Sequence, residues 1–517
     1  MTFEIVFVLL SLLGMVAALI ADKMRPGMIL FSVVVLFLCA GILTPKEMLE
    51  GFSNKGMITV ALLFLVSEGI RQSGTLGQVI KKLLPQGKTT VFKAQLRILP
   101  SVAFISAFLN NTPVVVIFAP IIKHWAKSVN LPATKFLIPL SYVTILGGIC
   151  TLIGTSTNLV VHGMILEAGF EGFSMFELGK VGIFIAIAGI VYIFLFSKRL
   201  LPDARPDTAV PDEEVEEGEK LHRVEAVLGA RFPGINKKLK DFNFQRHYGA
   251  EVKEIKTRNG QRFVSNLEAV VLHEGDTLVV MADDTFIPTW GESSVFVLLT
   301  NGNEPDTTGK KKRWFALLLL VLMIVGATVG ELPITKEMFP DIKLDMFFFV
   351  SITTIIMAWT NLFPARKYTK YISWDILITI ACAFAISKAM VNSGVADSVA
   401  KFIIGLSDDY GPHVLLAMLF IITNLFTELI TNNAAAALAF PLALSIAAQL
   451  GVSPTPFFVV ICMAASASFS TPIGYQTNLI VQGIGNYKFT DFVRIGLPLN
   501  IITFLISIIL IPLIWNF

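Results

Sequence analysis

The segment TLIGTSTNLVVHG at Thr151–Gly163 returns as TPIGYQTNLIVQG at Thr471–Gly483, a shift of 320 residues, with eight of thirteen positions identical. Two adjacent asparagines also recur in apolar surroundings, in LNNTPVVVIFAP from Leu109 and in TNNAAAALAFP from Thr431, where Asn110-Asn111-Thr112 aligns with Thr431-Asn432-Asn433 at a shift of 321. A weaker match joins two further segments at a shift of 320. Three blocks whose register agrees within one residue indicate that the chain is built from two related halves. The weaker match pairs Leu63–Gly74 with Ala383–Gly394.

The composition is that of a polytopic membrane protein. Of the 517 residues, 54% are hydrophobic and 15% are charged, whereas soluble domains carry about 25% charged residues. Several apolar runs approach the roughly 20 residues that cross a bilayer as a helix. Because no Lys or Arg precedes the first run, we expect a permanent helix there rather than a cleaved signal peptide. The runs are Phe3–Ile20, Met28–Ile42, Val181–Phe196, Phe315–Val329, Ile376–Ala389, Leu415–Phe426 and Ile495–Ile514.

A polar insert at Leu201–Arg313 separates the two halves. It opens with a proline-rich acidic linker, Pro202–Lys220, that we expect to be solvated and unstructured. HRVEAVL, AEVKEIKTRNGQRFV and DTLVVMA then suit strands, with RNGQ as a hairpin turn, and GINKKLKDFNF suits a short helix. We therefore expect a small α+β domain at about His222–Phe286. It lies between a first membrane repeat, residues 1–200, and a second, residues 314–517.

The distribution of basic residues predicts the orientation of the spans. Positively charged loops stay on the cytoplasmic side of a membrane. To place all the basic loops there, each half needs five full spans and one re-entrant hairpin that enters and leaves on the same side. The halves are then inverted repeats of an all-α polytopic fold, the insert is cytoplasmic, and such repeats with broken helices are typical of secondary transporters. The basic loops are Asp22–Arg25, Arg71–Arg97, Lys123–Lys135, Lys198–Arg199, Lys311–Arg313, Arg366–Lys370 and Lys488–Arg494.

Each asparagine pair marks the tip of a predicted hairpin. In the first half, Leu96–Leu109 leads in from a basic loop and Val114–Ile122 leads back. Pro113 disfavours helical geometry in the residue before it. Irregular backbone at that depth is tolerated only where it faces protein or a polar cavity. One such pair could simply hydrogen-bond neighbouring helices, but two matched pairs favour the two halves of one binding site.

The repeated segments predict two further interruptions of helices, around Gly154 and around Pro472 and Gly474. Broken helices expose carbonyl oxygens, which suit Na⁺, and amide N–H groups, which suit anions. The side chains offered are those of Ser, Thr, Asn and Gln, which donate and accept hydrogen bonds. Carboxylates, histidine clusters, Lys and Arg are missing from these motifs. The expected cargo is therefore Na⁺ together with an anion held by neutral donors.

Three charged residues lie within predicted spans and are functional candidates by default. Glu68 and Lys388 occupy equivalent positions in the two halves, and structural pairing or snorkelling explains them equally well. Glu428 precedes the second hairpin tip, where we expect it to support a sodium site. Small buried residues are the simplest interpretation of the cysteines, which have no metal-binding or disulfide spacing. They are Cys39, Cys150, Cys382 and Cys462.

With these motifs the sequence resembles the divalent-anion:sodium symporter family. That family carries a Ser-Asn-Thr motif at each of two hairpin tips and a Gly-Thr-Pro-Pro-Asn-like stretch in each broken helix. GTSTN and GYQTN stand in the broken-helix places here, and the asparagine pairs stand in the hairpin places. The insert resembles the C-terminal regulatory domain of TrkA-type potassium-uptake proteins. The combination is similar to the sulfate-transporter-like branch of the family.

The resemblance implies two sodium sites with an anion between them, in a homodimer that works by an elevator-type motion. It places a plasma-membrane or inner-membrane protein in contact with Na⁺, a small dianion and lipid, with an unidentified small-molecule regulator at the insert and no nucleic acid. No resident cofactor is implied. One sodium is expected near Ser106, Asn110, Asn111 and Gly154, and a second near Thr427, Thr431, Asn432 and Gly474. The anion is expected near Asn111, Thr112, Asn432, Asn433, Thr155, Ser156, Tyr475 and Gln476.

Sodium-coupled symport of sulfate is the leading function, with a C4-dicarboxylate as the alternative cargo. Tyr475 and Gln476 are bulkier and more polar than the two prolines that the family pattern has there, which favours a small tetrahedral oxyanion. A cation channel gated by the insert is the alternative from another class, but a channel needs a continuous carbonyl-lined filter and no Gly-Tyr-Gly-type run is present. A membrane enzyme is not expected, since the apolar part has no Ser/His/Asp or metal constellation.

Overall fold

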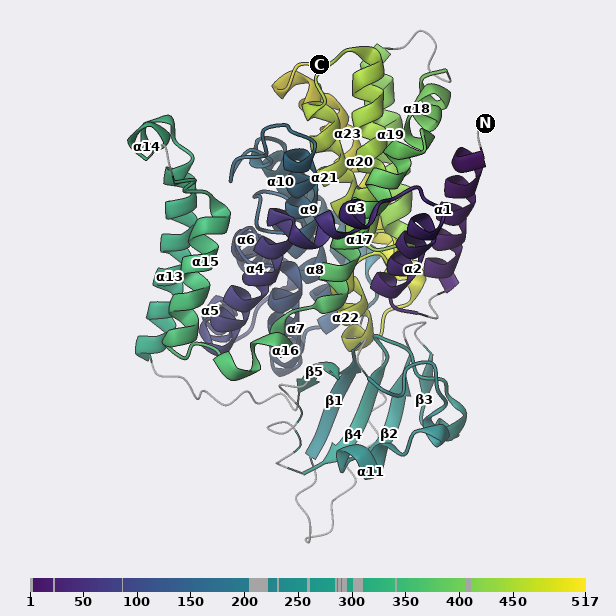
Figure 1. Cartoon of the computed structure of the whole chain (residues 1–517). Helices are drawn as coiled ribbons and strands as arrows, with labels where there is room; N and C mark the ends of the chain where they lie inside the picture. The colour runs from purple at the N-terminus through teal and green to yellow at the C-terminus, as the bar shows by residue number, and fades with distance from the viewer. Residues whose placement is uncertain are drawn as a thin grey trace, which may run out of the picture.

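The computed structural model describes residues 3–21, 24–85, 87–203, 222–229, 232–257, 261–283, 286, 290, 295–300, 310–339, 342–405 and 411–517. A body of packed helices carries a small sheet at one end (Figure 1). Among the described residues, seven helical stretches are long and apolar enough to cross a membrane. The protein is therefore a mostly helical, multi-span membrane protein.

The helices of the two halves follow one another in the same order. Seven consecutive helices of the first half, α4 to α10, have counterparts in α17 to α23, and α2 corresponds to α15. The first-half helices are α1 Phe3–Ala21, α2 Pro26–Cys39, α3 Pro45–Glu50, α4 Lys55–Gln72, α5 Thr75–Leu83, α6 Val91–Ser106, α7 Asn111–Ser128, α8 Leu137–Gly148, α9 Ser156–Glu167 and α10 Gly179–Leu200. The second-half helices are α13 Lys310–Gly330, α14 Pro333–Met338, α15 Met346–Trp359, α16 Tyr368–Tyr371, α17 Trp374–Asn392, α18 Val395–Gly405, α19 Gly411–Leu429, α20 Asn432–Leu450, α21 Thr455–Ser466, α22 Gln476–Gly485 and α23 Phe489–Ile514.

Both predicted interruptions occur in each half. Helices α6 and α7 meet at Asn110, and α19 and α20 meet at Thr431. Non-helical segments separate α8 from α9 and α21 from α22, where Gly154 and Gly474 lie. Gly474 has no room for a side chain, because a Cβ there would collide with the Thr427 carbonyl oxygen. At the second interruption the backbone of one segment therefore packs directly against the backbone of another.

The insert contains a five-stranded sheet in the order β3-β2-β4-β1-β5, with every neighbouring pair antiparallel. The three segments expected to be strands are confirmed. The sheet also takes in β5, which lies beyond Phe286, where we expected the domain to end. All of the acidic linker after Asp203, and the turn residues 258–260, lie outside the described residues. The strands are β1 His222–Leu228, β2 Glu251–Lys256, β3 Arg262–Phe263, β4 Thr277–Ala282 and β5 Phe296–Thr300.

The helix expected over GINKKLKDFNF is wrong for most of that segment, in which only a single 3-10 turn, Leu239–Asp241, is helical before Phe244. Asn236 has a left-handed backbone, φ 62°, and its N–H donates to Leu272 O at 2.7 Å, so the chain turns away from helical geometry. Lys238 then bridges to Val271. The helix α11 begins only at Phe244 and ends at Tyr248, after the Asn243 side chain has capped the Arg246 N–H at 3.0 Å.

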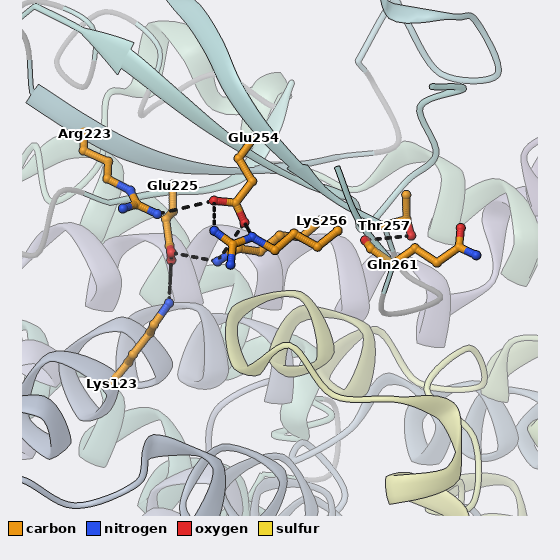
Figure 2. Close-up of polar contacts among 8 residues, drawn as sticks. Lys123, Arg223, Glu225, Glu254, Lys256, Thr257 and Gln261 are labelled. Atoms are coloured by element: carbon orange, nitrogen blue, oxygen red, sulfur yellow. Dashed lines mark hydrogen bonds and ion pairs between the residues drawn. The ribbon is translucent and has the colours of Figure 1, made fainter. Parts of the chain in front are cut away.

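One face of the sheet packs on the helical body. Lys123 of α7 contacts both carboxylate oxygens of Glu225 on β1 at 2.9 Å, and Glu225 also meets Lys256 of β2 at 3.4 Å (Figure 2). Glu254, beside Lys256, is buried, forms an ion pair with Arg262 and accepts a hydrogen bond from Arg262 Nη2 at 2.9 Å. On β4 the buried Thr277 packs against α22, because a Cβ on Gly483 would lie 2.5 Å from its Oγ1. The insert therefore contacts α7 and α22 directly.

Candidate functional site

Each asparagine pair meets the broken helix of the other half. Thr112 Oγ1, beside the first pair, donates to Gln476 Oε1 of the second half at 3.2 Å. In the opposite direction, Ser156 Oγ of the first half donates to Asn433 Oδ1 at 3.2 Å. Thr155 and Tyr475, the residues that precede α9 and α22, share a hydrogen bond at 3.0 Å. The structure thus brings residues of all four predicted motifs together at the boundary between the halves.

Four helices begin at this boundary. Helices α7, α9, α20 and α22 start at Asn111, Ser156, Asn432 and Gln476, and the contacts above join their first residues. A helix N-terminus presents unpaired N–H groups and the positive end of the helix dipole. No Lys or Arg lies in the first turn of any of the four. The arrangement is chemically suited to an anion held by neutral donors and dipoles.

Asn111 lies at the centre of a group of oxygen atoms. Its side chain is buried, and its amide lies 2.8 Å from Ser106 Oγ and 2.5 Å from Tyr475 Oη. In one rotation the amide oxygen faces Ser106 Oγ together with Thr144 O at 3.1 Å and Gly154 O at 3.2 Å. In the other rotation the two hydrogens of the NH₂ group face those three oxygens and the amide oxygen accepts from Tyr475.

The residues predicted around the second sodium also lie close together, but they are bonded differently. Thr427 Oγ1 donates to Ala465 O at 2.6 Å, and Gly474 packs on the Thr427 carbonyl. Asn432 Nδ2 donates to Thr157 Oγ1 at 2.7 Å. Thr431 Oγ1 is buried without a hydrogen-bond partner among the described residues. The two groups of oxygens are therefore related by sequence and not by identical contacts.

The side chain of Asn110 has different surroundings from that of Asn111. It precedes α7 without capping it through its side chain, and it borders a small pocket together with Ser156, Ser67 and Leu159. Leu159 also lines a larger cavity of about 1010 Å³, which Lys336 of α14 borders as well. Helix α14 lies at the end of the body away from the sheet (Figure 1), so part of this cavity's lining comes from that end.

The structure places a further matched pair of asparagines, Asn158 and Asn478, beside the candidate site. Neither was among the site residues predicted from the sequence. Asn158 Nδ2 donates to Thr151 O at 2.9 Å, and Asn478 Nδ2 donates to Thr471 O at 3.2 Å and to Ser468 O at 2.8 Å. Both side chains span the non-helical segment that precedes their own helix. The signal was present in the sequence, since both asparagines belong to the eight identities of the repeated segment.

The three intramembrane charges have different surroundings. Glu68 accepts two hydrogen bonds from Arg71, at 2.7 and 2.6 Å, which supports the structural interpretation of this residue. Lys388 is exposed on α17. Glu428 Oε1 accepts from Ser470 N at 2.9 Å and from Asn500 Nδ2 at 2.7 Å, next to the second broken helix. Glu428 is thus held beside the predicted sodium ligands and outside their group.

The chain matches the family model described as Citrate transporter (CitMHS) over residues 16–445 and 334–516. It is 30% identical to an uncharacterized transporter of Synechocystis, an alignment that covers 94% of this chain and 93% of that one. The chain therefore belongs to this family of membrane transporters and is not an enzyme.

Two further similarities concern a relative's cargo and the fold. Sodium/sulfate cotransporter 2 of Chlamydomonas reinhardtii is 31% identical over 281 residues, which are 54% of this chain and 31% of that protein. The crystal structure of the Alcanivorax borkumensis YdaH transporter matches with a TM-score of 0.52 at 12% identity, over 99% of this chain and 98% of that one. The second match concerns the fold alone.

Proposed function

We propose that the protein is a secondary transporter that couples the movement of Na⁺ to that of a small divalent anion, with sulfate as the leading cargo. The observation that carries the proposal is the meeting of four helix N-termini, from both halves, without a basic side chain in their first turns. Positive helix ends favour a dianion. Na⁺ is chosen as the companion ion because the neighbouring groups offer oxygen atoms.

The sodium ligands are proposed from the oxygens around each asparagine pair. In the first half, Asn111 Oδ1 can face Ser106 Oγ, Thr144 O and Gly154 O. These four oxygen atoms then lie close together, and only the Ser106 hydroxyl among them can donate a hydrogen bond. A hard monovalent cation neutralises such a group. In the second half the proposed ligands come from Thr427, Thr431, Asn432 and Gly474. Glu428 adds a negative charge close to the second sodium.

Alternating access follows in this proposal from the inversion of the two halves. Helix α5 lies near the sheet, whereas its counterpart α18 lies at the opposite end of the body (Figure 1). The site at the boundary then reaches either side by a movement of the helices that carry it, an elevator-type motion in a homodimer. The cavity lined by Leu159 and Lys336 is the proposed route from the side away from the insert.

A C4-dicarboxylate is the second candidate cargo, because the description of the matching family names citrate, which is also a multivalent carboxylate anion. The side chains at the boundary favour the smaller ion. Tyr475 is 7% exposed and reaches across to Thr155, so its ring fills space beside the four N-termini. A tetrahedral oxyanion needs less room than a four-carbon chain with two carboxylates.

Uptake into proteoliposomes tests the proposed function. We expect radiolabelled sulfate to enter when an inward sodium gradient is imposed, and to enter at background rate when potassium replaces sodium. Succinate in parallel vesicles distinguishes the two cargoes. Counterflow in vesicles preloaded with unlabelled anion distinguishes a carrier from a channel, since only a carrier exchanges label against its own gradient. Absence of sodium dependence for every dianion tested contradicts the proposal.

A further inference from the structure

The hydroxyl of Tyr475 lies between the two halves. Tyr475 comes from the second half, yet both groups that contact its phenolic oxygen belong to the first. These are the Asn111 amide at 2.5 Å and Thr155 Oγ1 at 3.0 Å. The ring is buried, and Tyr475 immediately precedes α22 while Thr155 immediately precedes α9. The hydroxyl is therefore placed where the helix N-termini meet.

The rotation of the Asn111 amide decides which way the Tyr475 hydroxyl points its hydrogen. When the amide oxygen faces Ser106, Thr144 O and Gly154 O, the NH₂ group donates to the phenolic oxygen. The phenol then accepts this bond, and its own hydrogen points away from Asn111, toward Thr155 Oγ1 at 3.0 Å or toward a bound anion. When the amide is turned over, its oxygen takes the hydrogen of Tyr475, because an amide oxygen has no hydrogen to offer.

A cation selects between these two rotations. Without one, the NH₂ group is best turned toward the three oxygens, where it satisfies acceptors that are otherwise crowded together. With a cation among those oxygens, the NH₂ group is repelled and the amide oxygen becomes a ligand. Cation binding thus turns the amide, and the turned amide frees the hydrogen of the Tyr475 hydroxyl.

We propose that Tyr475 is a sodium-dependent hydrogen-bond donor to the anion, switched by rotation of the Asn111 amide. The proposal rests on the sodium-coupled anion transport proposed above and explains how one ion favours the other. The position equivalent to Tyr475 in the first half is Thr155, which is too short to reach the second asparagine pair in the same way. In this proposal only the sodium in the first half affects anion binding through a tyrosine hydroxyl. The coupling between sodium and anion therefore differs between the two halves.

The Tyr475→Phe variant tests the proposal, because it keeps the ring and removes the hydroxyl. Binding of radiolabelled sulfate to purified protein is measured with and without Na⁺, and sodium binding alone is followed by thermal stabilisation. We expect sulfate affinity at saturating Na⁺ to fall roughly 10- to 100-fold, which is the loss of one hydrogen bond to a charged group. Sulfate affinity without Na⁺ and stabilisation by Na⁺ alone should stay close to wild type.

Tyr192→Phe is the matched control. Tyr192 is also buried and donates to a backbone carbonyl, Ile495 O, at 3.1 Å, away from the asparagine pairs. It should leave the ratio of sulfate affinities with and without Na⁺ unchanged. A Tyr475→Phe protein with lowered thermal stability but a wild-type ratio overturns the switch and leaves the proposed function intact. A wild-type protein whose anion binding ignores Na⁺, for sulfate and succinate alike, overturns both.

A second measurement does not depend on the folding of any variant. The ultraviolet resonance Raman spectrum of tyrosine reports whether a phenol donates or accepts hydrogen bonds. Adding Na⁺ to the wild-type protein without anion should weaken the hydrogen bond that one tyrosine donates, because its acceptor changes from the Asn111 amide oxygen to the Thr155 hydroxyl, and adding sulfate afterwards should strengthen it again. A spectrum that Na⁺ leaves unchanged overturns the proposal.

Discussion

Asn111 and Asn432 occupy matched places in the two halves and make unmatched contacts. Asn111 bonds to Tyr475 and Ser106, whereas Asn432 bonds to Thr157. The repeated sequence predicted that such residues would face one another across the boundary between the halves. It could not predict which partner each would take, because hydrogen-bond partners depend on local packing that a shared motif does not specify.

Alanine at either asparagine should weaken the apparent affinities for sodium and for sulfate together. Each amide supplies both an oxygen and an NH₂ group, and alanine replaces neither. Loss of one group from a buried polar network costs about 1–3 kcal/mol, or roughly 5- to 150-fold in affinity. Uptake measured over a range of sodium and sulfate concentrations provides both constants. Wild-type dependence on both ions in folded Asn111→Ala and Asn432→Ala proteins would assign the pairs to helix packing instead.

Alanine at Asn478 should destabilise the protein more than alanine at Asn158. Asn478 bonds to two carbonyl oxygens and also accepts from Ser141 Oγ at 2.7 Å, whereas Asn158 has a close contact with Thr151 O and a buried Oδ1 without a partner. Each buried acceptor left unpaired costs about 1–3 kcal/mol. Thermal unfolding of the purified variants in detergent gives the order, and equal or reversed losses would contradict this assignment of contacts.

At the scale of elements, the sequence predicted where membrane helices are interrupted better than it predicted the helix and strands of the insert. Proline, glycine and the asparagine pairs marked the interruptions after α6, α8, α19 and α21 because those residues disfavour a continuous helix. The helix expected at Gly234–Phe244 failed because Asn236 adopts a left-handed backbone that tertiary contact with Leu272 stabilises. Strand β5 was missed, because periodicity alone cannot assign a short apolar segment to a strand. It is pairing with β1 in the folded protein that makes it one.

The contact between α7 and β1 should depend on pH. Burial raises the pKa of Glu225, but the charges of Lys123 and Lys256 outweigh it and lower the pKa from 4.5 to about 2. A carboxylate with a lowered pKa stabilises the fold above its unfolded value and loses that contribution as the pH falls through its folded value. The contribution is therefore complete above about pH 4.5 and disappears between pH 4.5 and 2.

Lys123→Met tests this electrostatic contact. The variant should unfold at a lower temperature than wild type at neutral pH, because Glu225 loses its closest positive charge while remaining largely buried. The difference should shrink as the pH approaches 2. Lys253→Met is the control, since Lys253 contacts only the exposed Glu251 on the same strand among the ion pairs described. A difference that is independent of pH would show that Lys123 acts through packing alone.

For the whole molecule, the loop charges predict which end faces the cytoplasm. The insert should lie inside and the C-terminal Phe517 outside. Single cysteines introduced at Gln261 and at Phe517 in a cysteine-free background can be labelled from outside intact cells with an impermeant reagent. We expect labelling at position 517 and protection at 261 until the cells are opened. Labelling at 261 with protection at 517 would show that the predicted orientation is wrong, without bearing on how the helices pack.

The reciprocal contacts between the halves also bear on how the protein is made. Thr112 bonds to Gln476, and Asn111, which also has partners in its own half, bonds to Tyr475; both of these partners lie 364 residues later in the chain. At a synthesis rate of roughly 5–20 residues per second, these polar groups wait on the order of 20–70 s after they leave the ribosome. Unpaired polar groups are poorly tolerated in hydrocarbon. The boundary between the halves therefore closes only when the second half is inserted, and a chain truncated after the insert should be retained by quality control and degraded.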